Sequence, residues 1–190
     1  MPMGNDWCGL GWTEWAPLHR QAILQFAPTL PGVYRIRNQG GELNRLVYVG
    51  QTGRSLRERL MSLARGANAD ECPYNDPHTA APHLWLLQRL DGARFDFSCA
   101  AVGGNVQLLR GTEDMLLWQH RVQSGSSTIA NYGRFYPGYA RATNRWIVRR
   151  NGGRAPGHRA APFTDDLAQA IQFCSARPVY FKPSGGSGYH

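Results

Sequence analysis

The sequence has little lysine, no closely spaced cysteines and no long apolar run. Lys182 is the single lysine among 21 basic residues, and the others are arginine. The four cysteines, Cys8, Cys72, Cys99 and Cys174, lie far apart, which argues against a disulfide framework and favours a reducing compartment. No apolar segment approaches the ~20 residues of a membrane span, and no signal-peptide pattern opens the chain. We therefore expect a cytoplasmic protein without a membrane partner.

Acidic residues are absent from residues 115–164, in a chain whose net charge is +8. This window contains eight arginines interleaved with aromatic residues. A basic stretch of this kind is the electrostatic footprint of nucleic-acid binding, although a solvated basic face has the same composition. The residues that we predict to contact nucleic acid, with double-stranded DNA as the expected partner and RNA as the alternative, are Arg57 outside this window and, within it, Arg134, Arg141, Arg145, Arg149, Arg150 and Arg154.

A chain of 190 residues can bury a core without covalent staples, and its length suits one domain with extensions. We expect a Trp-rich helical arm over residues 1–30, a core over 31–135, and a basic DNA-contacting extension with a C-terminal helix over 136–190. In the arm, Thr13 is expected to cap a helix that ends near Phe26. The tryptophans Trp7, Trp12 and Trp15 are predicted to anchor the arm on the core, with base stacking or a dimer contact as the alternative.

The core begins with a strand, a turn, a second strand and a helix. The strands are expected at residues 33–37 and 46–49, because both are rich in β-forming residues and the glycine-containing sequence between them is turn chemistry. Ser55 with Glu58 three residues later forms a capping box, which predicts a helix start. Gly66 is the expected stop of that helix.

Two tyrosines and one arginine in this unit need an explanation. If the hairpin is symmetric about Gly41, Tyr34 lies directly opposite Tyr48 and both rings share one face, which an aromatic core pair would explain. Arg59, however, falls inside the apolar stripe of the helix, where a charge is costly without an anionic partner. A phosphate fits the guanidinium fork, so the alternative is a phosphate-binding site.

Three short motifs together resemble the GIY-YIG nuclease family: Gly32-Val33-Tyr34, Tyr48-Val49-Gly50, and Leu56-Arg57-Glu58-Arg59-Leu60. The resemblance implies an α+β fold, with a small three-stranded antiparallel sheet flanked by helices. It also implies hydrolysis of DNA phosphodiesters with one divalent metal ion, Mg²⁺ or Mn²⁺. Tyr34 and Tyr48 would then be the active-site tyrosines, with Tyr34 as base or relay for the attacking water, and Arg59 would face the phosphate.

The chain departs from the family at Leu63, where a His or Tyr often follows the arginine by one turn. His78 and His83, near the end of a long polar loop, are the candidates to replace it, because histidine transfers protons near neutral pH. We assign the catalytic part to His78. A zinc site built from Cys72, His78, His83 and Cys99 is a further alternative, but its spacing matches no standard pattern.

The remaining site candidates follow a third strand, expected at residues 94–100 from its alternating pattern. Thr112 is expected to cap a helix over 113–123, so Glu113 could be a first-turn acid that suits the helix dipole. The resemblance instead implies that Glu113 holds the metal, as a carboxylate does for Mg²⁺, with Asp114 as the fallback. Asn131 matches the family's site asparagine, although asparagine also stands before turns for local reasons.

The resemblance therefore implies a metal-dependent DNA endonuclease of the restriction type. Cutting both strands of a duplex takes two active sites, which predicts a homodimer. Three alternatives stay open: a structure-specific repair or recombination nuclease, a DNA-binding module of the same fold with impaired catalysis, and an RNA-directed enzyme. The motifs do not reveal which DNA sequence or modification the protein would recognise, because base readout depends on a few side chains in groove geometry.

Overall fold

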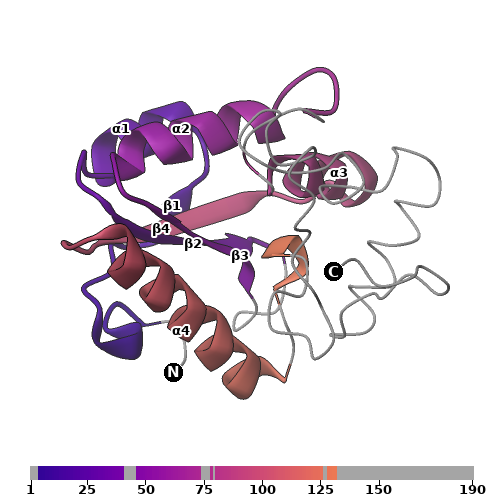
Figure 1. The fold of residues 1–190 in the computed structure, drawn as a ribbon. Helices are drawn as coiled ribbons and strands as arrows, with labels where there is room; N and C mark the ends of the chain where they lie inside the picture. The colour runs from indigo at the N-terminus through magenta and orange to yellow at the C-terminus, as the bar shows by residue number, and fades with distance from the viewer. Residues whose placement is uncertain (1–3, 41–45, 74–77, 79, 126–127, 132–190) are drawn as a thin grey trace, which may run out of the picture.

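A four-stranded antiparallel sheet lies between two layers of helices (Figure 1). The computed structural model describes residues 4–40, 46–73, 78, 80–125 and 128–131. The sheet order is β1-β4-β2-β3. The elements are η1 (Trp7–Gly9), β1 (Ala16–Pro17), α1 (Arg20–Phe26), β2 (Gly32–Asn38), β3 (Leu46–Thr52), α2 (Leu56–Ala67), α3 (Ala81–Asp91), β4 (Phe95–Ala101), α4 (Val106–Ser124) and η2 (Ile129–Asn131). The α+β class is therefore confirmed, while the predicted extension over 136–190 lies outside the described residues.

The sheet has one strand more than predicted. The three expected strands are present as β2, β3 and β4, and the short strand β1 adds to the edge of β4 through the pair Ala16↔Phe97. The prediction of a helix beginning at Thr13 is wrong. The Thr13 amide donates to the Cys99 carbonyl at 2.9 Å, and Pro17 disfavours helical geometry in the residue before it. The helix α1 begins only at Arg20.

The hairpin register also differs from the predicted one. Tyr34 pairs with Gly50, and Ile36 pairs with Tyr48, so the two tyrosines are diagonal neighbours rather than directly opposed. A register irregularity between Ile36 and Arg37 accompanies this shift. Because side chains alternate with a period of two, a shift by two residues keeps both tyrosines on the same face. Their ring centroids are 5.8 Å apart.

The two faces of the sheet carry separate cores. On the first face, α1, α2 and α3 cover the sheet, and the predicted apolar stripe of α2 (Leu56, Leu60 and Leu63) is fully buried. On the second face, α4 and the N-terminal segment cover the sheet, with Trp7 and Trp12 packed beside residues of α4. The prediction that these two tryptophans anchor the N-terminal segment is therefore confirmed.

Arg35, on β2 next to Tyr34, is fully buried on the second face. Its guanidinium carbon lies 4.2 Å from the Trp12 ring centroid and 4.6 Å from that of Trp15, and its Nη2 donates to the Gly4 carbonyl at 3.2 Å. Burial lowers the pKa of Arg35 to about 10. The N-terminal segment therefore fixes β2 from the face opposite Tyr34.

The boundaries of α2 and α4 agree only in part with the predicted ones. Ser55 caps α2 as predicted, with its hydroxyl accepting from the Glu58 amide at 3.2 Å, but α2 continues one residue past Gly66. The start predicted for the helix after the third strand is wrong. This helix, α4, begins at Val106, and its N-cap is Asn105 rather than Thr112. Glu113 therefore lies beyond the first turn of α4, and the helix dipole does not explain it.

Candidate active site

Tyr34 and Tyr48 cross directly over Gly50, and only glycine fits there. A Cβ at Gly50 would lie 2.6 Å from the Tyr34 Cζ and hydroxyl oxygen, and 2.7 Å from the Tyr48 Cε1. The other motif glycine, Gly32, is similarly constrained, because its Cβ would meet the Ala100 carbonyl oxygen at 2.1 Å. Close approach of neighbouring groups, rather than turn geometry, therefore accounts for both glycines. Sequence reasoning missed this cause, since it depends on cross-strand neighbours.

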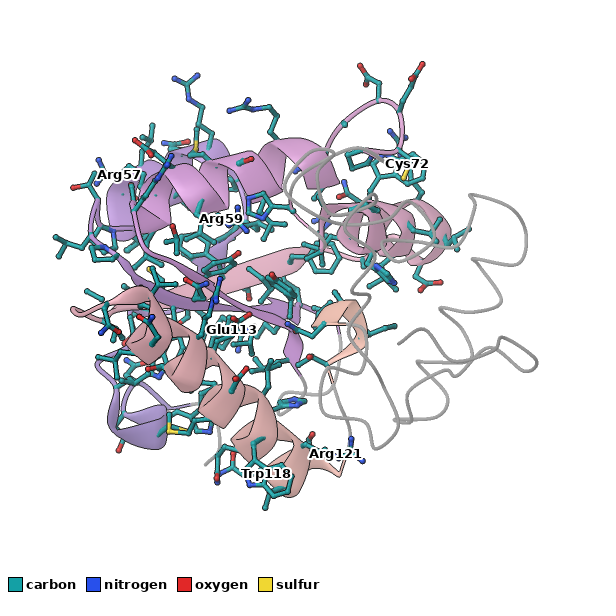
Figure 2. The ribbon with its side chains drawn as sticks, in the orientation of Figure 1. Arg57, Arg59, Cys72, Glu113, Trp118 and Arg121 are labelled. Carbon is teal, nitrogen blue, oxygen red and sulfur yellow. The ribbon has the colours of Figure 1, made fainter. Side chains whose placement is uncertain are left out.

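Arg59 and Glu113 approach the Tyr34 hydroxyl from different layers of the molecule. Figure 2 shows Arg59 on the sheet-facing side of α2 and Glu113 on the sheet-facing side of α4. The Glu113 side chain is buried, with 8% of its surface exposed. A buried carboxylate is costly without compensating groups, so the burial of Glu113 on the sheet-facing side of α4 calls for an explanation.

Burial and several neighbouring side chains together shift the pKa of Tyr34. Complete burial raises the pKa of Tyr34 above its ordinary value, and this is the largest effect. The positive charge of Arg59 lowers it, and the neighbouring polar groups of Arg59 and Tyr48 lower it further. The negative charge of Glu113 raises it again. One tyrosine hydroxyl is therefore under the influence of three of the predicted site residues, and it keeps its proton at neutral pH.

A pocket of about 190 Å³ opens beside Arg59, between the loop after β3, the first turns of α2 and His78. Its lining is polar and consists of Thr52, Arg54, Ser55, Glu58, Arg59, Ser62 and His78. His78 is buried, so the structure does place the predicted histidine next to Arg59. Leu63 belongs to the apolar core instead. His83 is buried in the first turn of α3 and does not line this pocket.

Asn131 holds the outer edge of β3 beside Tyr48. Its side-chain oxygen accepts from the Val49 amide at 2.9 Å, and its side-chain nitrogen donates to the Val49 carbonyl at 2.7 Å. His120, on α4, covers the same edge, because its Nε2 accepts from the Leu46 amide at 2.9 Å. The structure therefore gives both residues a positioning contact with the strand that carries Tyr48.

The other candidates lie further away or outside the described residues. Arg57 uses its Nε to bind the Ala27 carbonyl at 2.8 Å, so part of its guanidinium is committed to holding α1 against α2. The predicted DNA-contacting residues Arg134, Arg141, Arg145, Arg149, Arg150 and Arg154 are not among the described residues. Their contacts with DNA stay a prediction.

The donor set at the site suits a hard cation rather than zinc. Within the described ranges, no group of three or more His, Cys, Asp or Glu side chains comes together, so the zinc alternative on Cys72 and Cys99 has no support. Those two thiols and Cys8 are free. Mg²⁺ commonly binds through one or two carboxylates, with waters and substrate phosphates completing its shell. The buried Glu113 carboxylate fits that mode of binding, whereas Asp114, the next residue on the helix, points in a different direction.

Comparisons with family models, with curated proteins and with solved structures each found no match. Among the described helices, none combines the length and the apolar character needed to cross a membrane. A function therefore has to be inferred from the arrangement of the site residues: the tyrosine pair over Gly50, with Arg59 on one side and Glu113 on the other.

Proposed function

We propose that this protein is a metal-dependent DNA endonuclease of the restriction type, with its active site at Tyr34, Tyr48, Arg59 and Glu113. The observation that carries the proposal is the convergence of Arg59 and Glu113, from helices on opposite faces of the sheet, on the buried hydroxyl of Tyr34. An arginine and a carboxylate on either side of a tyrosine hydroxyl supply what phosphodiester hydrolysis needs: a group for the phosphate, a ligand for a cation and a group for water.

Each residue has a role that follows from its surroundings. Arg59 binds a non-bridging phosphate oxygen and stabilises the charge that builds up as water attacks. Tyr34 is protonated at neutral pH, because burial raises its pKa, so it is not a deprotonated general base. Its oxygen orients the water, and its hydroxyl relays the water's proton. Tyr48 lies beside Tyr34, with its ring centroid 5.8 Å away. Asn131 fixes the strand on which Tyr48 lies.

The reaction needs two proton movements. Water attacks phosphorus and gives its proton through the Tyr34 hydroxyl to bulk solvent, while the bond from phosphorus to the leaving sugar oxygen breaks and that oxygen gains a proton. His78 beside Arg59 is the group suited to give that proton, since histidine titrates near neutral pH. Glu113 would hold one Mg²⁺ or Mn²⁺ ion, which when bound polarises the phosphate and stabilises the leaving oxygen.

The test is cleavage of supercoiled plasmid, both unmodified and methylated, in the presence of Mg²⁺ or Mn²⁺. Glu113→Gln keeps the size of the side chain but removes the charge, and we expect a loss of at least ~10²-fold in rate with DNA binding retained. Asp114→Asn is the matched control on the same helix and should cut like the wild type. Tyr34→Phe and Arg59→Ala should also lose activity. Equal rates for Glu113→Gln and the wild type would refute the site.

One observation favours a second function, a DNA-binding module of the same fold without catalysis. Leu63 is fully buried in the core, so the helix provides no His or Tyr at the position four residues after Arg59 where the family often has one. This alternative predicts salt-sensitive DNA binding without cleavage of any plasmid. It also predicts that His78→Ala changes nothing, whereas the nuclease proposal expects a slower reaction and a changed pH profile for this variant. Discrete fragments that require Glu113 would exclude the binding module.

A further inference from the structure

The helix α4 carries two apolar faces, and only one of them packs on the sheet. Its buried side consists of Leu109, Glu113, Leu116, Leu117 and His120. On the other side lies an exposed stripe, which we call the α4 stripe: Leu108, Gly111, Met115, Trp118 and Val122. Figure 2 shows Trp118 on the side of α4 that faces away from the sheet. A helix that is apolar on both sides normally has something packed against each.

The exposure of the α4 stripe is unusual for a surface helix. Trp118 is 57% exposed and Val122 60% exposed, and Leu108 and Met115 are also among the exposed large apolar side chains. Single exposed apolar residues need no explanation, but a continuous patch marks an interaction site. The stripe runs along most of the length of α4, so it offers an extended surface rather than a small pocket.

The spacing of the stripe identifies the kind of partner that fits it. The intervals from Leu108 to Val122 are three, four, three and four residues, which is the a/d pattern of a two-helix coiled coil. The large Trp118 and the small Gly111 both occupy d positions. In an antiparallel pair, a positions face d positions, so a two-fold axis between Met115 and Trp118 places Met115 opposite the Trp118 of the second copy and Gly111 opposite its Val122. The stripe is therefore complementary to a second copy of itself, as a two-fold interface requires.

We propose that the α4 stripe is the surface through which two copies of this chain associate, with the two α4 helices antiparallel. The choice of a second copy also rests on the proposed function, because cutting both strands of a duplex takes two active sites. Glu113 lies on the opposite side of α4 from the stripe, so pairing would leave both active sites uncovered. One helix pair buries less area than the ~800 Å² per partner of a standard interface, so the dimer is weak and concentration-dependent.

Salt gives this dimer a signature. Each chain carries a net charge of +8, so two copies repel each other, and added salt screens that repulsion. Association through the apolar stripe should therefore strengthen when salt is raised, whereas binding to DNA weakens under the same change. An association held together by ion pairs would respond in the opposite direction.

The first experiment is sedimentation velocity of the full chain without DNA, over a range of protein concentrations and at low and high salt. We expect the wild type to shift from monomer towards dimer, and Trp118→Glu to weaken association at least ~10-fold. The matched control is Leu90→Glu, which charges a similarly exposed apolar residue on α3 and should dimerise like the wild type. A wild type that stays monomeric at every concentration, or equal weakening by both variants, would overturn the proposal.

A second experiment shows whether the partner is another copy or a segment of the same chain. Met115→Glu and Trp118→Lys should each be monomeric, because each places an unpaired charge in the apolar interface, and an equimolar mixture should form a heterodimer in which the two opposite charges face each other. Rescue in the mixture requires two chains, so a mixture that stays monomeric would overturn the proposal. Neither experiment measures cleavage. The dimer proposal can therefore be refuted while the nuclease proposal stands, and the nuclease proposal can be refuted while the dimer proposal stands.

Discussion

Replacing Gly50 with alanine should destabilise the protein, although the same change is usually favourable in a strand. Glycine in the middle of a strand costs roughly 0.5–1 kcal/mol relative to alanine through backbone entropy. Gly50 does not have a positive φ, so its backbone would accept alanine. The opposing effect is steric, because the new Cβ would lie 2.6 Å from two atoms of Tyr34 and 2.7 Å from Tyr48.

The magnitude follows from how far the rings must move. Carbon atoms in good contact are about 3.5–4.0 Å apart, so both rings must shift by about 1 Å within a closely packed interior. Overpacking of this kind costs about 1–3 kcal/mol, which outweighs the backbone gain and leaves a net loss of about 1–2 kcal/mol. The same shift displaces the Tyr34 hydroxyl, so under the proposed function DNA cleavage should fall together with stability.

Urea denaturation at low protein concentration measures this change in the free energy of unfolding. The control is Gly111→Ala, because Gly111 lies within α4 and a Cβ there would meet nothing within 4 Å. This control should gain about 0.5–1 kcal/mol from helix propensity. If Gly50→Ala were as stable as the wild type, the rings would have room to move, and the close packing that we assign to the motif glycine would be refuted.

Three further changes test the framework around the site. Arg35→Ala should cost about 2–4 kcal/mol in urea denaturation, because it leaves a void against Trp12 and removes a buried cation–π contact. Asn131→Ala should cost about 1–3 kcal/mol and speed hydrogen exchange of the Val49 amide, which would lose its acceptor; unchanged exchange would contradict this. Burial raises the pKa of Cys99 to about 11, so the folded state holds the thiol proton more tightly, and stability should be complete below the unfolded pKa of ~8.5 and decrease as pH rises towards 11. Urea titrations across that range should show a shallower decrease for Cys99→Ala.

The parts of the fold that sequence predicted well are those with local chemical causes. The turn sequence before Gly41 predicted the β2–β3 hairpin, and the Ser55 hydroxyl that accepts from the Glu58 amide marks the predicted start of α2. The errors come from interactions between distant segments. Thr13 could have capped a helix, but its backbone pairs with Cys99 instead, and Thr112 only donates to the Leu108 carbonyl inside an already formed helix.

The candidate site likewise has one part that local sequence patterns predict and one part that depends on packing between distant segments. Tyr34, Tyr48 and Arg59 lie within one short stretch, so a shift of two residues in the register could not separate the tyrosines onto different faces. The electrostatic influence of Glu113 on Tyr34 is different, because it depends on how α4 packs against the sheet from the other layer. No local pattern encodes that packing. The resemblance to a known family supplied Glu113, and the residues themselves gave only a first-turn acid, which the structure rules out.

The charges around Tyr34 also explain how the proposed active site can be stable without a bound phosphate or metal ion. A buried carboxylate such as Glu113 and a half-buried guanidinium such as Arg59 would each be costly alone. Here both act on one hydroxyl that stays neutral, so the region holds one positive and one negative charge in the layers on either side of the sheet. A phosphate would be drawn to Arg59 and a divalent cation to Glu113. Binding the two together preserves that balance, whereas binding either alone would disturb it. Metal and DNA should therefore bind cooperatively at this site.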